Sequence, residues 1–379
     1  MYFSYKLKQE VIELYWNTAL YNLAINLTYI FEPIFLFNLG FGLIRIMAFY
    51  LMVYAAYALL ILPVTKLTAR IGYKHAIFIS TIIYVLYWTV LYQIKFHTIL
   101  IFLAPVLFAL QKSFFWPPYN ADVAISNVKK QRGREIGVLF SVVELVAIVG
   151  PIIGGFISYQ FGFSILFAAA AFLMIASVFP LLLSPEIYNK HRFHFRNLWG
   201  VAKKYPYNFF GYWGYAEDLM LMSLWPLYIY AIIPAVFSVG VVITVASLIA
   251  IVVMLYLGKL IDRFSVRKFL PVTAVAYGFS WLIRFFSASV PGVVVFDTLT
   301  RLGKAAVNVP LLSQTFELAG ERGSDYAIAY AVFFEFSLAV GKVVAALAAI
   351  WILAATGNIY YVFVVAGGMT MLYSLVKKK

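Results

Sequence analysis

The 379-residue sequence contains no cysteine, and only 12% of its residues are charged. The absence of cysteine excludes disulfide bonds, thiolate nucleophiles and zinc–thiolate sites. The four histidines all fall in or beside predicted loops, so we expect no intramembrane metal site and no bound cofactor: His75, His97, His191 and His194. A soluble domain has about twice this share of charged residues. The scarcity of charge therefore excludes a soluble enzyme, a secreted disulfide scaffold and a disordered chain.

Apolar residues dominate instead. Hydrophobic residues make up 64% of the chain and aromatic residues 19%, and the mean hydropathy is +0.92. A membrane-spanning helix needs roughly 20 apolar residues, and the chain is long enough for twelve of them with loops to spare. The sequence therefore predicts an all-α, polytopic membrane protein.

The apolar runs divide the chain into twelve predicted transmembrane helices. They cover residues 14–37, 41–62, 75–94, 98–119, 135–158, 162–183, 207–231, 236–257, 269–288, 291–314, 326–352 and 358–375. The first run carries polar residues such as Asn17 and Glu32 and lacks a small-residue cleavage site, so we do not expect a cleavable signal peptide.

The connections between these runs alternate in charge. One set is short and nearly uncharged, with Lys95 as its main cation, whereas the other set and both chain ends hold most of the 29 lysines and arginines. Because basic loops face the cytoplasm, we expect a plasma-membrane protein with both termini cytoplasmic. The net charge of +14 is then a topology signal that also attracts anionic lipids, and we expect no nucleic-acid partner.

The chain contains an internal repeat. The segment 144–155 aligns with 335–346, so that Glu144 matches Glu335, and Lys112 matches Lys304 at nearly the same offset. Each offset is close to half of the chain length. The sequence therefore predicts two pseudo-symmetric six-helix bundles, 1–183 and 207–379, joined by a cytoplasmic linker at 184–206.

Two loops in matching places carry a common motif. The segment GKLIDRFSVRK (258–268) resembles the signature loop of the major facilitator superfamily, with matches at Gly258, Asp262, Arg263 and Arg267. The first-half copy keeps Arg70, Gly72 and Lys74 but has Ala69 in place of the aspartate. The resemblance implies the superfamily fold and alternating access. It also implies that the loop aspartate caps a helix of the other half, on one side only in this chain.

A group of small residues lies on the fifth predicted helix. Gly150, Pro151, Gly154 and Gly155 form a face on which a neighbouring backbone can approach closely, and proline removes one helical hydrogen bond. The face can serve either as a hinge between halves or as plain helix packing. VGPIIGG (149–155) also resembles an element frequent in proton-driven exporters, although Val146 replaces the preceding family glycine.

Charged residues inside the spans are costly and mark function. Six basic residues (Arg45, Lys112, Arg284, Arg301, Lys304, Lys342) face six acids (Glu32, Glu144, Glu217, Asp218, Asp297, Glu335). We expect Asp297 and Arg301, four apart on one helix, to pair, and Glu32 and Arg45 to be partners. An acid that alternates between a cation and water can carry a proton, so the candidate proton carriers are Glu144, Glu335, Glu217 and Asp218. Permanent structural ion pairs are the alternative.

The resemblance also implies which helices surround the substrate. It places predicted helices 1, 4, 7 and 10 around a central cavity, and the candidate substrate residues are then Asn22, Asn26, Lys112, Glu217, Asp218, Arg301 and Lys304. Aromatic residues such as Tyr21 and Trp116 can enclose a solute. Arg301 and Lys304 are expected to approach Glu217 and Asp218 across this cavity, unless Arg301 serves Asp297 alone.

These features predict a secondary active transporter for a small organic or amphipathic solute, coupled to protons and favouring export. We expect it to be a monomer whose partners are its substrate and the membrane lipids. A lipid or lysolipid flippase and a solute importer are alternatives within the same fold. A membrane-embedded enzyme would need an intramembrane histidine, cysteine or carboxylate cluster, and an ATP-driven pump would need a phosphate-binding loop that the sequence lacks. A channel is disfavoured by the duplication.

Overall fold

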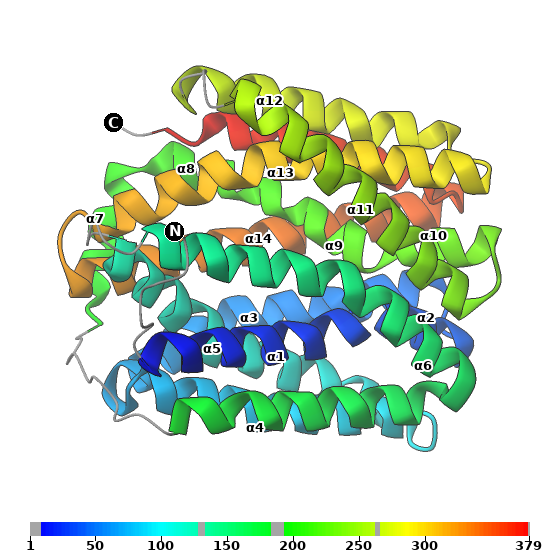
Figure 1. Cartoon of the computed structure of the whole chain (residues 1–379), viewed down its shortest axis with the longest axis horizontal. Coiled ribbons are helices and arrows are strands. Elements are labelled where there is room, and N and C mark those ends of the chain that lie inside the picture. The colour runs from blue at the N-terminus through cyan, green and yellow to red at the C-terminus, as the bar shows by residue number, and fades with distance from the viewer. Residues whose placement is uncertain (1–8, 128–132, 183–192, 262–265, 378–379) are drawn as a thin grey trace, which may run out of the picture.

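The computed structural model describes residues 9–127, 133–182, 193–261 and 266–377. These residues form helices and short connections, with no strand among them. Figure 1 shows most of the helices running roughly along the long axis of the molecule, with the start of α1 and the end of the chain near the same end.

The first half comprises α1 to α6. The bounds of these helices are Gln9–Thr28 (α1), Phe31–Asn38 (α2), Leu43–Ile71 (α3), Tyr73–Gln93 (α4), Leu103–Asn127 (α5) and Gly133–Leu182 (α6), with a 3₁₀ turn η1 at Thr98–Ile101. Two of the predicted helices are joined in α6, where Gly162 has φ 81°. This left-handed conformation suits glycine and reverses the chain direction without a longer loop.

The second half comprises α8 to α15. The bounds are Pro206–Gly211 (α8), Glu217–Met222 (α9), Leu224–Ile232 (α10), Val236–Ile261 (α11), Val266–Leu282 (α12), Val290–Gly320 (α13), Ser324–Thr356 (α14) and Tyr360–Met371 (α15). The 3₁₀ turns are Tyr212–Ala216 (η2), Ile283–Phe286 (η3) and Leu372–Leu375 (η4). The predicted helix at 207–231 is thus divided into four pieces. Glu217 and Asp218 lie in the first turn of α9, next to one of its breaks.

Seven of the described helical segments are long and apolar enough to cross a membrane by length and composition. One of them is Val142–Phe179, which contains the turn at Gly162. The segments Leu270–Phe286 and Tyr360–Leu375 are apolar but shorter. Because the sequence prediction allowed shorter and more charged spans, it counted more helices than this criterion does.

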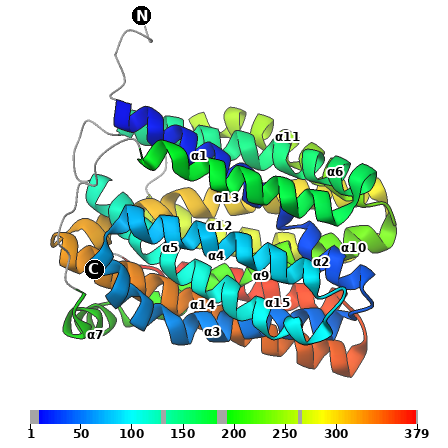
Figure 2. The same cartoon turned by 90° about the horizontal axis from the view of Figure 1, so that it is seen from below.

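The segment predicted as a polar linker contains a helix. Residues Phe195–Lys204 form α7, whose Val201 is buried while Phe195 and Trp199 are exposed. Figures 1 and 2 place α7 at the end of the molecule from which α14 begins. Helix α7 therefore has a packed side and an exposed side.

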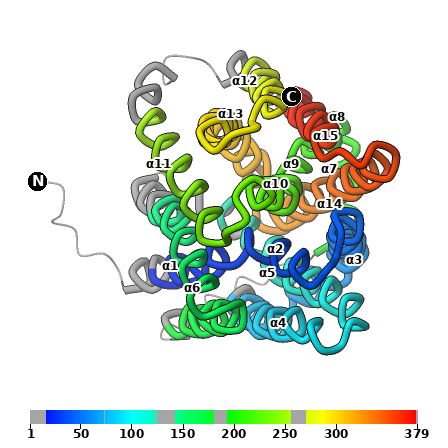
Figure 3. The backbone as a smooth tube through the Cα atoms, turned by 90° about the vertical axis from the view of Figure 1, so that its right-hand side faces the viewer, coloured from blue at the N-terminus to red at the C-terminus, as the bar shows by residue number. Residues whose placement is uncertain are grey.

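The two halves lie side by side. Figure 3, which looks along the helices, shows α1 to α6 on one side and most of α8 to α15 on the other. The halves meet along two main contacts, α3 with α14 and α6 with α11. At the second contact the Thr244 hydroxyl donates a hydrogen bond to the carbonyl of Ile148 over 2.9 Å.

The small face of α6 serves close packing. A Cβ on Gly150 would lie 2.5 Å from Asn26 Cβ, and one on Gly154 would lie 2.1 Å from the carbonyl oxygen of Leu27, both on α1. A Cβ on Gly155 would lie 3.3 Å from Phe237 on α11. The small face, which includes Pro151, therefore packs on α1 within its own half and on α11 in the other half.

Candidate functional site

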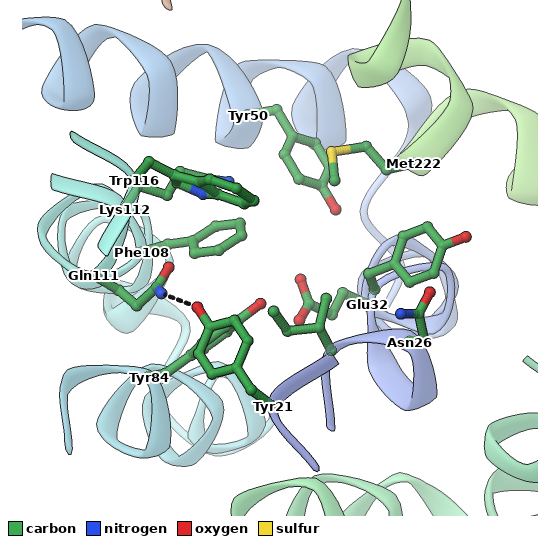
Figure 4. Close-up of a pocket in the computed structure, with 12 residues that line it drawn as sticks. Tyr21, Asn26, Glu32, Tyr50, Tyr84, Phe108, Gln111, Lys112, Trp116 and Met222 are labelled. Carbon is green, nitrogen blue, oxygen red and sulfur yellow. Dashed lines mark hydrogen bonds between the residues drawn. The ribbon is translucent and has the colours of Figure 1, made fainter. Parts of the chain in front are cut away.

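A cavity of about 170 Å³ lies within the first half and reaches the second half at Met222. Its walls come from α1 to α5 and α9, and the residues that line it are Tyr21, Ile25, Asn26, Tyr29, Glu32, Tyr50, Tyr84, Phe108, Gln111, Lys112, Trp116 and Met222. Figure 4 shows aromatic rings around the cavity, with Lys112 and Glu32 on different walls. The cavity is thus mainly aromatic, with one cation and one carboxylate.

Stacked rings make the walls rigid. Tyr21 stacks on Phe115 with ring centroids 4.3 Å apart, and Tyr84 stacks on Trp88 at 4.3 Å. The Gln111 amide donates hydrogen bonds to the hydroxyl oxygens of Tyr21, over 2.9 Å, and Ser80, over 3.1 Å. Aromatic stacking and satisfied polar groups hold side chains in fixed positions, so the cavity is preformed.

Lys112 is the cation of this cavity. Its Nζ lies 4.4 Å from the centroid of the Phe108 ring and 5.7 Å from that of Tyr54, which are cation–π distances. Within the described part of the chain, Lys112 makes no hydrogen bond or ion pair. Its charge is therefore available to a bound solute.

Glu32 is the buried acid of the cavity. Its carboxylate accepts hydrogen bonds from the Tyr87 hydroxyl over 2.8 Å and from the Trp88 indole over 2.9 Å. The predicted partnership with Arg45 is wrong for the described structure, because Arg45 is exposed and makes no ion pair with Glu32 there. Neutral aromatic donors, rather than a cation, hold this carboxylate.

The second half carries a dense group of ion pairs. Lys304 of α13 forms an ion pair with Asp218, and its Nζ lies 3.4 Å from Oε1 of Glu217. Lys342 of α14 lies 3.9 Å from Oδ2 of Asp218 and donates a hydrogen bond over 3.4 Å to the Tyr54 hydroxyl on α3. The structure therefore contains the predicted approach of Lys304 to both acids of α9.

Arg301 has a different partner. Its Nε lies 2.8 Å from Oδ2 of Asp297, one turn earlier on α13. Asp297 also binds the buried Arg284 over 2.9 Å. The guanidinium of Arg284 lies between two indole rings, 3.8 Å from the centroid of Trp225 and 4.2 Å from that of Trp281. Asp297 thus holds two arginines, and no ion pair between Arg301 and the α9 acids occurs among the described residues.

The two duplicated glutamates differ. Glu335 of α14 is buried and accepts hydrogen bonds from two residues of the first half, the Tyr57 hydroxyl over 3.0 Å and the Asn120 amide over 2.7 Å. Glu144 of α6 is exposed. Of these two glutamates, only Glu335 therefore joins the halves through the side-chain hydrogen bonds of the described residues.

The remaining predicted residues have simpler surroundings. The amides of Asn22 and Asn26 donate to backbone carbonyls one turn earlier on α1, and Asn26 lines the cavity. Gly72, with φ 93°, ends α3, close to Arg70 and Lys74. Asp262 and Arg263 lie outside the described residues, as do the surroundings of Gly258 and Arg267.

Several residues around these groups were not predicted as site residues. Tyr57 and Asn120 contact Glu335, whereas Gln111, Tyr84 and Tyr50 line the cavity. Their sequence signal is weak, because polar and aromatic residues occur throughout the chain. The described residues contain no group of three or more histidines and acids able to hold a metal ion.

Comparisons with known proteins agree with this architecture. The family model of the Major Facilitator Superfamily matches residues 14–233. A structure of a variant of the nucleoside transporter NupG is similar with a TM-score of 0.68 and 12% identity, covering 97% of this chain and 98% of that one. A variant of the E. coli fucose:proton symporter FucP gives 0.64 and 13% identity, covering 97% and 96%. At these identities the likeness establishes the fold. A search of curated protein sequences gave no match.

Proposed function

Since the chain belongs to the Major Facilitator Superfamily, we propose that it is a proton-coupled secondary transporter that moves a small organic solute by alternating access. The observation that carries this proposal is the aromatic cavity with a cation free of ion pairs among the described residues. The cavity lies beside a contact between the two halves. A solute bound there is close to the groups that must rearrange when the halves move.

The cavity favours a solute of limited size and mixed polarity. Its volume of about 170 Å³ is close to that of an engineered cavity of about 150 Å³ that holds benzene. Lys112 attracts an anionic or hydrogen-bond-accepting group, Glu32 accepts from a hydroxyl or amine, and the rings pack against an apolar body. We propose a ring-sized solute with an acceptor and a donor at opposite ends. A lipid or lysolipid is the alternative.

Glu335 is the proton carrier that we propose first. Its carboxylate is buried and bound by neutral donors of the other half. A proton can therefore bind and leave without breaking an ion pair. Its binding weakens the carboxylate of Glu335 as the acceptor of the hydrogen bonds from Tyr57 and Asn120, which join the two halves. We rank Glu217 and Asp218 second, because protonating either acid would break its ion pair with Lys304.

Two observations bear on the direction of transport, and they favour opposite directions. The VGPIIGG element on α6 favours export. The similarity to a fucose:proton symporter favours uptake as the second candidate. We propose export, with a proton gradient in place of any cofactor, in a monomer whose termini lie in the cytoplasm.

The test begins with a thermal-shift screen of the purified protein against small cyclic acids, amino acids, sugars and lysolipids, because a specific ligand stabilises by mass action. A hit is then loaded into proteoliposomes with a pH gradient of either sign. We expect a ring-sized solute whose movement against its gradient requires the pH gradient. Stabilisation by lysolipids alone, or solute flux indifferent to the pH gradient, would contradict the proposal.

A further inference from the structure

The helix α7, in the segment that joins the halves, has an exposed face of unusual composition. Phe195 is 56% exposed and Trp199 is 65% exposed. Arg196 and Lys203 are exposed beside them, and the helix contains no acidic residue. Two large aromatic residues held in water are unfavourable, whereas aromatic residues next to cations suit the boundary of a lipid bilayer.

The spacing places these four side chains on one side of the helix. Phe195 and Trp199 are four residues apart, which puts them one turn apart on the same face. Trp199 and Lys203 are also four apart, and the Nζ of Lys203 lies 5.5 Å from the centroid of the Trp199 ring. The aromatic strip is therefore bordered directly by a basic strip.

The opposite side of α7 packs on α14. Leu198 packs on a cluster that contains Ala69 of α3, Ala121 of α5, and Ile328 and Val332 of α14. Lys204 also forms an ion pair with Glu321, over 3.3 Å, next to the start of α14. The position of α7 is thus tied to the α3–α14 contact, which also holds the hydrogen bond from Tyr57 to Glu335.

We propose that the exposed face of α7 binds anionic phospholipid, with Phe195 and Trp199 entering the headgroup region and Arg196 and Lys203 pairing with lipid phosphates. Because α7 packs on α14, whose residues share a cluster with residues of α3 and α5, bound lipid favours the arrangement in which those three helices are packed together. Charge complementarity selects anionic over neutral lipid, since the exposed groups of α7 are cationic. The predicted orientation identifies the leaflet as the inner one, but the binding itself does not depend on it.

The test uses the full chain in nanodiscs of phosphatidylcholine with increasing amounts of phosphatidylglycerol, present in both leaflets. Gly200 is exposed and a Cβ there would meet no atom within 4 Å, so Gly200→Cys accepts a fluorescent label. The chain has no other cysteine. We expect phosphatidylglycerol to reduce the access of an aqueous quencher to the label.

The variant Arg196→Gln with Lys203→Gln should move the midpoint of this titration about tenfold, since each basic residue near an anionic surface contributes measurably to binding. The charge-conserving variant Arg196→Lys with Lys203→Arg should keep the parent midpoint, which separates loss of charge from misfolding. Lys95→Gln is a further control, because Lys95 also lies near an aromatic ring, at 5.5 Å from Phe96, but in another loop.

Three results would overturn the proposal. The first is equal quenching in neutral and anionic nanodiscs. The second is an unchanged midpoint in the Arg196→Gln, Lys203→Gln variant. The third is an equal effect of inorganic phosphate in neutral nanodiscs, which would contradict a lipid ligand. None of these measurements needs a transported solute, so their outcome is separate from that of the proposed function.

Discussion

Lys112 and Lys304 occupy matching positions in the two halves, but their surroundings differ. Lys112 lies against the Phe108 ring and faces a cavity, without an ion pair among the described residues. Lys304 lies between Asp218 and Glu217. A lysine that already pairs with two acids has little charge to offer a solute, whereas one that contacts only rings does. We infer that the first half mainly binds the solute, whereas the charges of the second half mainly pair with one another.

The duplicated glutamates show the same division. Glu335 bonds to Tyr57 and Asn120 of the other half, whereas Glu144 is exposed. A repeated sequence position therefore keeps its residue type while its role diverges.

The largest effect is expected at Glu335. Glu335→Gln removes the group that exchanges a proton and keeps one oxygen, which replaces only one of the two carboxylate oxygens that accept from Tyr57 and Asn120. We expect flux driven by a pH gradient to be abolished, while counterflow, which needs no net proton movement, continues. Glu144→Gln is the matched control and should keep the pH-driven flux. Equal flux in parent and Glu335→Gln proteoliposomes would indicate that an α9 acid, Glu217 or Asp218, carries the proton instead.

The second effect is on stability. Lys304→Met leaves the fully buried Glu217 and the neighbouring Asp218 without their nearest cation. The expected loss is about 3 kcal/mol, at the lower end for a broken buried pair because Lys304 is 27% exposed. Thermal unfolding in detergent measures it, and Lys112→Met is the control that should change little. A larger loss in Lys112→Met than in Lys304→Met would reverse the comparison.

The third effect separates packing from a hinge on α6. Gly154→Ala would bring a Cβ to 2.1 Å from the carbonyl oxygen of Leu27, and we expect a loss of about 1–3 kcal/mol in thermal stability. Gly368→Ala on α15 meets no atom within 4 Å and should be neutral or slightly stabilising. If Gly154→Ala left stability unchanged but altered flux, the hinge interpretation would replace packing.

The smallest effect concerns Lys112 as a ligand. Lys112→Gln should weaken binding of an anionic or acceptor-bearing solute about tenfold, or about 1.4 kcal/mol, by removing a charge-assisted hydrogen bond. The dependence of the unfolding temperature on solute concentration gives the affinity. The unfolding temperature without solute should stay near that of the parent. Unaltered affinity would remove Lys112 from the solute site.

The sequence predicted the fold well because its signals are physical and long. Hydropathy located the helices, loop charge predicted an orientation, and the repeat indicated the duplication. The break of the helix at 207–231 and the helix α7 were not predicted. Both features depend on tertiary packing. For α7, Leu198 packs on a cluster that contains residues of α14.

The pairing of charges was predicted where it is local, and for Lys304 with the α9 acids, whose helices the superfamily resemblance placed around one cavity. Asp297 and Arg301 are one turn apart on α13, so helix geometry alone brings them together. Glu32 with Tyr87 and Trp88, and Glu335 with Tyr57 and Asn120, join helices far apart in sequence. Neutral donors of this kind carry no charge signal, and the sequence therefore favoured Arg45 for Glu32 wrongly.

A proton on Glu335 is expected to control the contact between α3 and α14. Spin labels on Leu67→Cys and Ser324→Cys, near the ends of these helices that lie beside α7, report on this contact in a chain without other cysteine. Double electron–electron resonance measures their distance across a pH series. We expect a lower pH to shift the parent toward longer distances, and Glu335→Gln to show these distances at every pH. A pH response of Glu335→Gln equal to that of the parent would contradict this expectation.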